Sequence, residues 1–143
     1  EKEFILWDGC CKYHNNIKIN EIYELKEKYP NSKILVHPEC QKQIRDIADY
    51  IGSTAGIINY ATNNDYKDYI IATEEGILYE LKKKNPDKNF YIPGGSISCV
   101  DMKKTTLNNL YDTLLNMKNE VILDESVSKN ALKCLENMHS LAK

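Results

Sequence analysis

Three side chains that can take part in chemistry directly follow one apolar run of the sequence. The run 33–36 is followed by His37, Pro38, Glu39 and Cys40. Proline lacks an N–H group and cannot continue a sheet ladder, so we expect a buried strand to end here. Ligands bind beyond the carboxyl ends of strands in open parallel sheets. His37 and Glu39 are therefore a candidate acid–base or substrate-binding pair, although an ordinary histidine beside a surface glutamate explains the pattern equally well.

Hydroxyl groups occupy two further positions of the same kind. Ser53 and Thr54 stand at the expected start of a helix, and Thr73 and Glu74 follow another apolar run. Free N–H groups at a helix start can bind an anion, although serine and threonine more often simply cap the helix. We interpret Thr73 and Glu74 first as a helix-capping pattern. In a parallel sheet, both positions would share one edge with His37.

The five cysteines are Cys10, Cys11, Cys40, Cys99 and Cys134. Their odd number and the absence of a Cys-x-x-Cys spacing indicate a reducing compartment, where cysteines are core residues, metal ligands or nucleophiles. We expect Cys134 in the core, because it adjoins an apolar helical stripe. Cys40 is expected in the first turn of a helix, which would lower its thiol pKa. Cys11 and Cys99 are expected in loops and suggest metal ligands, but two thiolates alone complete neither a zinc nor an iron–sulfur site.

Composition restricts the class of protein. The chain has 143 residues, of which 42% are hydrophobic and 28% charged, with a net charge of −2. These values are typical of a globular domain of ordinary size. The short lysine clusters indicate solvated helix ends and not a nucleic-acid surface. No apolar run approaches the roughly 18 residues of a membrane span, and no signal peptide is visible. We therefore expect a cytoplasmic protein without nucleic-acid or membrane partners.

Short apolar segments alternate with amphipathic segments of helical length. This alternation predicts an α/β fold, with helices layered on a short parallel sheet. The expected strands cover residues 4–7, 33–36, 69–72 and 90–92. The expected helices cover residues 20–29, 40–51, 54–62, 73–84, 106–117 and 126–138.

Several short motifs follow one another in a fixed order along nearly the whole chain. They are Leu6–His14, Val36–Cys40, Gly52–Ile58, Ala72–Gly76, Lys83–Lys88 and Cys99–Leu107. Together they resemble the quinolinate synthase family, the iron–sulfur enzymes of NAD biosynthesis. No single motif is specific, whereas the ordered set is.

The resemblance implies three αβα units around a pseudo-threefold axis, each donating one cysteine to a 4Fe–4S cluster. Cys11, in a Trp-x-Gly-x-Cys-x-x-His pattern, matches one cluster ligand, and Cys99 matches the last. Cys10 is an extra thiol beside Cys11 and a less well-spaced alternative. An iron with an open coordination site would act as a Lewis acid. The implied reaction condenses iminoaspartate with dihydroxyacetone phosphate to give quinolinate, with loss of phosphate and water.

The resemblance also implies roles for residues at the strand ends. His37 and Glu39 match the family's catalytic and substrate-binding pair. Ser53 and Thr54 match the helix start that binds a substrate carboxylate or phosphate. Glu74 lies in a matched motif, for which we expect a supporting role.

The family's first unit, with its own ligand cysteine, has no counterpart in this sequence. We therefore expect the C-terminal part of the enzyme. Residues 1–31 would end the preceding αβα unit, residues 32–103 would form a complete unit, and residues 104–143 would form a C-terminal helical segment. A missing N-terminal portion would supply the third cluster cysteine, so the chain alone is expected to be inactive.

Two other hypotheses use the same residues. One is a cluster-free α/β module that binds a small carboxylate or phosphate at Ser53 and Thr54. The other is an enzyme with Cys40 as nucleophile and His37 as base. We prefer the cluster, because neither alternative gives a role to both Cys11 and Cys99.

Overall fold

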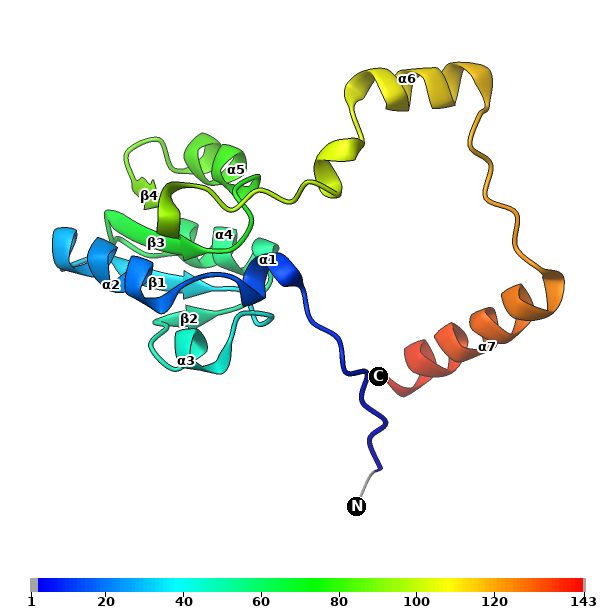
Figure 1. Cartoon of the computed structure of the whole chain (residues 1–143), viewed down its shortest axis with the longest axis horizontal. Helices are drawn as coiled ribbons and strands as arrows, with labels where there is room; N and C mark the ends of the chain where they lie inside the picture. Colours follow the sequence, from blue (N-terminus) through cyan, green and yellow to red (C-terminus); the bar gives the residue numbers. More distant parts are fainter. Residues whose placement is uncertain (1–2, 143) are drawn as a thin grey trace. The chain divides into compact units, whose positions relative to one another are not determined.

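The computed structural model describes residues 3–142, which divide into two compact units. Unit 1 covers residues 1–100 and unit 2 covers residues 101–143. Unit 1 contains the sheet and its flanking helices, and unit 2 consists of helices joined by irregular segments (Figure 1). None of the helices within residues 3–142 is long and apolar enough to cross a bilayer.

Unit 1 is built on a parallel sheet with the strand order β2-β1-β3-β4. The strands are β1 (Lys33–Val36), β2 (Tyr50–Ile51), β3 (Asp68–Ala72) and β4 (Asn89–Tyr91). The two central strands pair from Lys33 with Tyr69 to Val36 with Ala72. All four strands therefore end on the same side, which we call the carboxyl edge.

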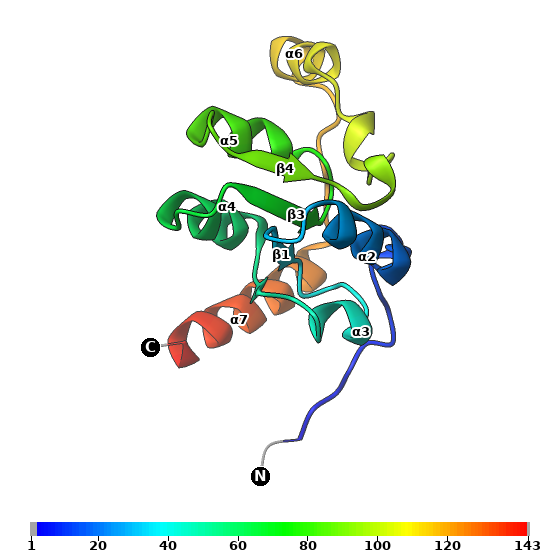
Figure 2. The ribbon, with the colours of Figure 1, turned by 90° about the vertical axis from the view of Figure 1, so that its left-hand side faces the viewer.

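Helices cover both faces of this sheet. Figure 2 shows α4 and α5 on one face and α2 and α3 on the other. The helices of unit 1 are α1 (Lys12–Asn15), α2 (Ile19–Lys28), α3 (Lys42–Arg45), α4 (Thr54–Asn63) and α5 (Ile77–Lys84), with a 3-10 turn at Pro93–Gly95. The predicted α/β class with three layers is confirmed.

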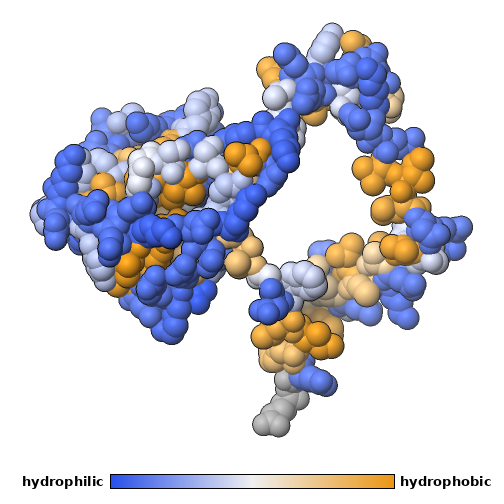
Figure 3. Space-filling view, viewed as in Figure 1, coloured by the Kyte–Doolittle hydropathy of each residue, from blue (hydrophilic) through white to orange (hydrophobic). Residues whose placement is uncertain are grey.

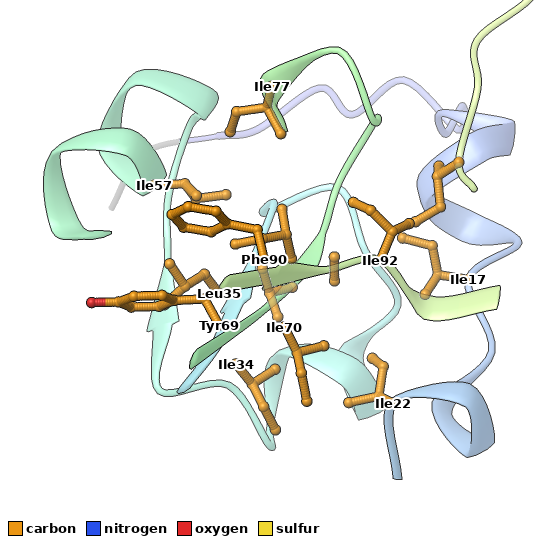
Figure 4. Close-up of a cluster of buried hydrophobic side chains, with 14 of the residues drawn as sticks. Ile17, Ile22, Ile34, Leu35, Ile57, Tyr69, Ile70, Ile77, Phe90 and Ile92 are labelled. Carbon is orange, nitrogen blue, oxygen red and sulfur yellow. The ribbon is translucent and has the colours of Figure 1, made fainter. Parts of the chain in front are cut away.

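The core of unit 1 lies on both sides of the central strands (Figure 4). Leu35 in β1 and Ile70 in β3 are completely buried, as are Ile22 of α2 and Ile57 of α4. A strand buried on both faces has a continuous apolar run, which explains why β1 and β3 are visible in the sequence. Each such side chain contributes about 1.5–3 kcal/mol when it is removed from water.

The predicted helix over 40–51 is wrong. Only α3 is helical, and the chain then extends into β2, which pairs with the end of β1. Asp49 ties the segment before β2 to β1. Its carboxylate accepts a hydrogen bond from Ile34 N–H at 2.8 Å and forms an ion pair with Lys33 at 2.7 Å. A strand of two residues is too short for its apolar period to be recognised.

The predicted strand over 4–7 is also wrong. Residues 3–10 have no regular structure, and Trp7 is 92% exposed. A strand is stable only when a neighbouring strand pairs with it, and none of the strands among residues 3–142 does so.

Unit 2 contains a 3-10 turn (Met102–Lys104) and the helices α6 (Leu107–Asn116) and α7 (Glu125–Leu141). Both helices were expected. The hydroxyl of Thr106, at the expected start of the helix, accepts a hydrogen bond from Asn109 N–H at 3.1 Å and caps α6. Asp124 caps α7, and its carboxylate accepts hydrogen bonds from the N–H groups of Ser126 and Val127.

No described residue of unit 2 is buried. Leu110 and Leu135 are each about half exposed, although both lie on the expected apolar stripes. Figure 3 shows hydrophobic atoms at the surface over residues 121–123 and along α7. The prediction that Cys134 is a core residue is therefore wrong, because its thiol is exposed.

Candidate functional site at the carboxyl edge

The carboxyl edge gathers the polar residues that follow the strands. The ladder continues one step beyond β1, because His37 N–H donates to Ala72 C=O at 3.1 Å and Gly52 N–H donates to Val36 C=O at 3.0 Å. These bonds fix the positions of His37, at the end of β1, and of Ser53, beyond the end of β2. The expectation that the strand-end residues share one edge is confirmed.

The short helix α1 brings a second histidine to this edge. His14 Nε2 lies 3.0 Å from the hydroxyl of Thr73, which follows β3. Its ring also stacks on that of His37, with centroids 4.3 Å apart and planes 11° apart. His14 is only 8% exposed. The sequence gives His14 no separate role, although His14 ends the Trp-x-Gly-x-Cys-x-x-His pattern that contains Cys11.

The carboxylate of Glu39 lies close to both imidazoles. Its Oε2 atom is 2.9 Å from His14 Nδ1 and 3.5 Å from His37 Nδ1. The backbone N–H of Glu39 donates to His37 Nδ1 at 3.3 Å, which leaves Nε2 to carry the proton of a neutral His37. The carboxylate side chain is about half exposed. The turn after β1 therefore presents a solvent-accessible carboxylate beside two histidines.

Burial controls the charge of His14. Its removal from water lowers the pKa of His14, and the neighbouring His37 lowers the pKa further, while Glu39 partly opposes both effects. Burial therefore favours the neutral form of His14.

Cys11 is the residue that precedes α1, and its C=O accepts a hydrogen bond from Asn15 N–H at 2.9 Å. Its thiol, a ring nitrogen of His14 and a carboxylate oxygen of Glu39 all lie within 4.8 Å of one another. The expected loop cysteine thus belongs to the same cluster as Glu39. Cys10 lies one residue earlier and is exposed, whereas Cys11 is half-buried.

Three hydrogen bonds from backbone N–H groups hold the segment that carries Cys99 at the same edge. Glu75 N–H donates to Ile97 C=O at 2.8 Å, and Cys99 N–H donates to a carboxylate oxygen of Glu74 at 3.2 Å. Val100 N–H donates to the hydroxyl of Tyr13, in α1, at 3.0 Å. The segments that carry Cys99 and Cys11 are therefore joined directly by a hydrogen bond. Cys99 is buried.

Thr73 and Glu74 do not start a helix. The prediction of a helix from residue 73 is wrong at its start, because α5 begins at Ile77. The hydroxyl of Thr73 contacts His14, and Glu74 accepts hydrogen bonds from Gly76 N–H at 2.7 Å and from Cys99 N–H. Both side chains therefore connect the end of β3 to the cysteine-bearing segments.

Ser53 and Thr54 mark the start of α4 at the carboxyl edge. The hydroxyl of Ser53 accepts a hydrogen bond from Gly56 N–H at 3.2 Å, which is the common capping use of serine. Both residues are exposed. A substrate carboxylate or phosphate at this helix start stays a prediction.

Cys40 is a core residue. It is 2% exposed, and its thiol donates to Ala72 C=O at 3.4 Å. Burial raises the pKa of the Cys40 thiol to about 11. The expected lowering of its pKa is wrong, because Cys40 lies in a turn before α3 and not in the first turn of a helix. A thiol that stays protonated at neutral pH gives no support to the nucleophile hypothesis.

The fold and this edge define an α/β domain that presents thiols, imidazoles and a carboxylate at the carboxyl ends of parallel strands. The family described as NadA, quinolinate synthetase A protein, matches residues 1–140. A quinolinate synthase of Clostridioides difficile (strain 630) is 68% identical over 142 residues, which cover 99% of this chain and 47% of that protein. A quinolinate synthase of Clostridium novyi (strain NT) is 51% identical over 141 residues, covering 98% of this chain and 46% of that protein.

The chain therefore belongs to the quinolinate synthase family. It spans about half the length of the curated relatives that it matches.

Proposed function

We propose that this chain is the part of a quinolinate synthase that carries two cluster cysteines and the substrate-handling pair. The reaction condenses iminoaspartate with dihydroxyacetone phosphate to form quinolinate in NAD biosynthesis, with loss of phosphate and water. The observation that carries this proposal is the convergence of Cys11, His37, Glu39 and Cys99 on one sheet edge. Membership of the family supports the same function.

The cysteines fit the cofactor of the proposed enzyme. Thiolates are the usual protein ligands of a 4Fe–4S cluster, and both Cys11 and Cys99 are free. The hydrogen bond between Tyr13 and Val100 holds their two segments together. A third thiolate would come from a part of the enzyme outside this chain. When bound, the cluster supplies a Lewis-acidic iron.

The contacts of Cys11 and Cys10 support Cys11 as the ligand. The thiol of Cys11 lies among ligand-forming atoms at the carboxyl edge, whereas Cys10 is exposed.

The thiols of Cys10, Cys11 and Cys99 are free, which also supports the proposed location in the reducing cytoplasm.

The substrate-handling residues act through charge and proton position. The half-exposed carboxylate of Glu39 accepts a hydrogen bond or a proton from a substrate nitrogen or hydroxyl, and His37 offers its Nε2 proton to a substrate oxygen. His14 lies beside this carboxylate, with its Nδ1 atom 2.9 Å from Glu39 Oε2, and its lowered pKa disfavours a positive charge there. The N–H groups at the start of α4, beside Ser53 and Thr54, bind a substrate carboxylate or phosphate.

We also propose the domain limits expected from the resemblance. Residues 32–103 would be one complete αβα unit, which the presence of all four strands between residues 33 and 91 supports. Residues 1–31 would end the preceding unit of a pseudo-threefold arrangement, although α2 also packs on β3. Residues 104–143 would be the C-terminal helical segment.

The test is quinolinate formation by the complete enzyme that carries this sequence, assayed without oxygen. Glu39→Gln and His37→Gln should each lower kcat/KM by about 10²-fold or more, because each removes a proton-transfer or binding group. Glu80→Gln, in α5, is the matched control and should keep full activity, because this half-exposed carboxylate pairs, among the described residues, only with the neighbouring Lys83. Full activity of Glu39→Gln with an intact cluster would contradict the assignment.

A further inference from the structure

A buried nitrogen at the carboxyl edge has no hydrogen-bond partner. His14 Nδ1 is shielded from water, and no described residue forms a hydrogen bond with it. Glu39 Oε2 lies 2.9 Å away but outside the geometry of a hydrogen bond. Buried polar atoms in folded proteins are almost always paired, with protein, water or an ion. The nitrogen therefore points to a group that belongs beside it.

The other nitrogen of the ring is already used. His14 Nε2 lies 3.0 Å from the hydroxyl of Thr73, which is itself buried at the end of β3. Stacking on His37 holds the plane of the ring. Metal-binding histidines characteristically bind the ion through one nitrogen while a hydrogen bond at the other nitrogen fixes the orientation. His14 is thus oriented as a metal ligand, with Nδ1 as the free donor.

Two more ligand-forming side chains stand next to the imidazole of His14. The thiol of Cys11 and a carboxylate oxygen of Glu39 complete a set whose ligand atoms all lie within 4.8 Å of one another. Metal–ligand bonds of about 2.0–2.3 Å in a tetrahedral site require ligand atoms roughly 3–4 Å apart. The side chain of Glu39 is about half exposed, so it has room to rotate toward the other two ligands. Cys11 and His14 need little movement, since α1 places them one helical turn apart.

We propose that Cys11, His14 and Glu39 form a binding site for a single divalent cation of the Zn²⁺ or Fe²⁺ class. One thiolate, one imidazole and one carboxylate suit these borderline ions and do not suit Mg²⁺ or Ca²⁺, which prefer oxygen ligands alone. A fourth position stays open to water. Binding displaces the proton of the Cys11 thiol into solvent.

This site and the proposed cluster both require Cys11. A single ion held by His14 and Glu39 would therefore compete with cluster assembly for the same thiolate. The competition rests on the proposed function, whereas the ion site rests only on the three side chains. A substitution of Cys99 distinguishes the two sites, because Cys99 belongs to the proposed cluster and not to the single-ion site.

The test is a titration of the reduced 143-residue chain with Co²⁺ under anaerobic conditions. Co²⁺ reports thiolate coordination through a sulfur-to-metal charge-transfer absorption band. We expect one equivalent to bind with this band, and Cys11→Ser to abolish it. His14→Gln and Glu39→Gln should each weaken Co²⁺ binding by roughly 10- to 100-fold or more. Removal of a group that only supports a metal ligand already costs about this much affinity.

Cys10→Ser and Cys99→Ser are the matched controls and should keep the affinity of the unmodified chain. Unchanged Co²⁺ affinity in Glu39→Gln, or loss of the band in Cys99→Ser, would overturn the proposal. Far-ultraviolet circular dichroism checks that each variant folds. If His14→Gln does not fold, Glu39→Gln decides the outcome, since Glu39 is half exposed. A cluster that survives Cys99→Ser in the complete enzyme would overturn the proposed function and leave the Co²⁺ result unaffected.

Discussion

The helices of the two units have similar apolar stripes but different environments. In unit 1, Ile22 of α2 and Ile57 of α4 are completely buried against the sheet. In unit 2, Leu110 of α6 and Leu135 of α7 stay about half exposed. An apolar stripe predicts that a helix has a face to bury, but it does not identify what covers that face. The sheet supplies the cover in unit 1, and no described residue of unit 2 is buried.

The largest expected effect is on the core of unit 1. Ile70→Ala in β3 should lower the free energy of unfolding by about 2–5 kcal/mol, because it leaves a cavity between two packed layers. Leu110→Ala in α6 should change it by less than about 0.5 kcal/mol, because the side chain is 48% exposed. Chemical unfolding monitored by circular dichroism compares the two variants. Equal losses would show that α6 is buried against another part of the chain.

The cysteines allow a second comparison of the units. At pH 8, iodoacetamide should modify exposed Cys134 at least about 10²-fold faster than Cys40, because only the thiolate reacts and burial raises the pKa of Cys40 to about 11. Mass spectrometry of the labelled peptides measures both rates in one sample. Comparable labelling rates would contradict the buried position of Cys40.

The folded chain holds the Cys40 proton more tightly than the unfolded chain. The free energy of unfolding should therefore fall as pH rises from about 9 to about 11.

The smallest expected effect concerns the start of α7. Asp124→Ala removes the carboxylate that accepts hydrogen bonds from Ser126 and Val127. This change should destabilise α7 by about 1 kcal/mol and leave the sheet of unit 1 unaffected. Hydrogen exchange resolved by residue measures both regions, with Ser128→Ala as the control. Slower exchange in α7, or faster exchange in β3, would show that the stability of this helix depends on more than its own cap.

The sequence predicted the parts of the fold that depend on local pattern. The runs that form β1 and β3 are continuous because central strands are buried on both faces, and Thr106 caps α6 through a contact only three residues away. The two-residue strand β2 escaped prediction, because it depends on pairing with β1 and on the carboxylate of Asp49.

The candidate site was predicted only in part for the same reason. His37 and Glu39 were recognised because a proline marks the strand end beside them. The contribution of His14 was missed, since its hydrogen-bond partner Thr73 is 59 residues away in sequence. Cys40 was misjudged, because its pKa depends on burial beneath the edge and not on a helix start.

The central claim is that Cys11 and Cys99 bind the iron–sulfur cluster of the complete enzyme. Iron and acid-labile sulfide in the anaerobically purified protein test it most directly. We predict that Cys11→Ser and Cys99→Ser each lose the cluster and its visible absorption, whereas Cys10→Ser and Cys40→Ser retain both. Full iron and sulfide content in either of the first two variants would contradict the ligand assignment. An unmodified enzyme without iron would favour a cluster-free module that binds a carboxylate or phosphate.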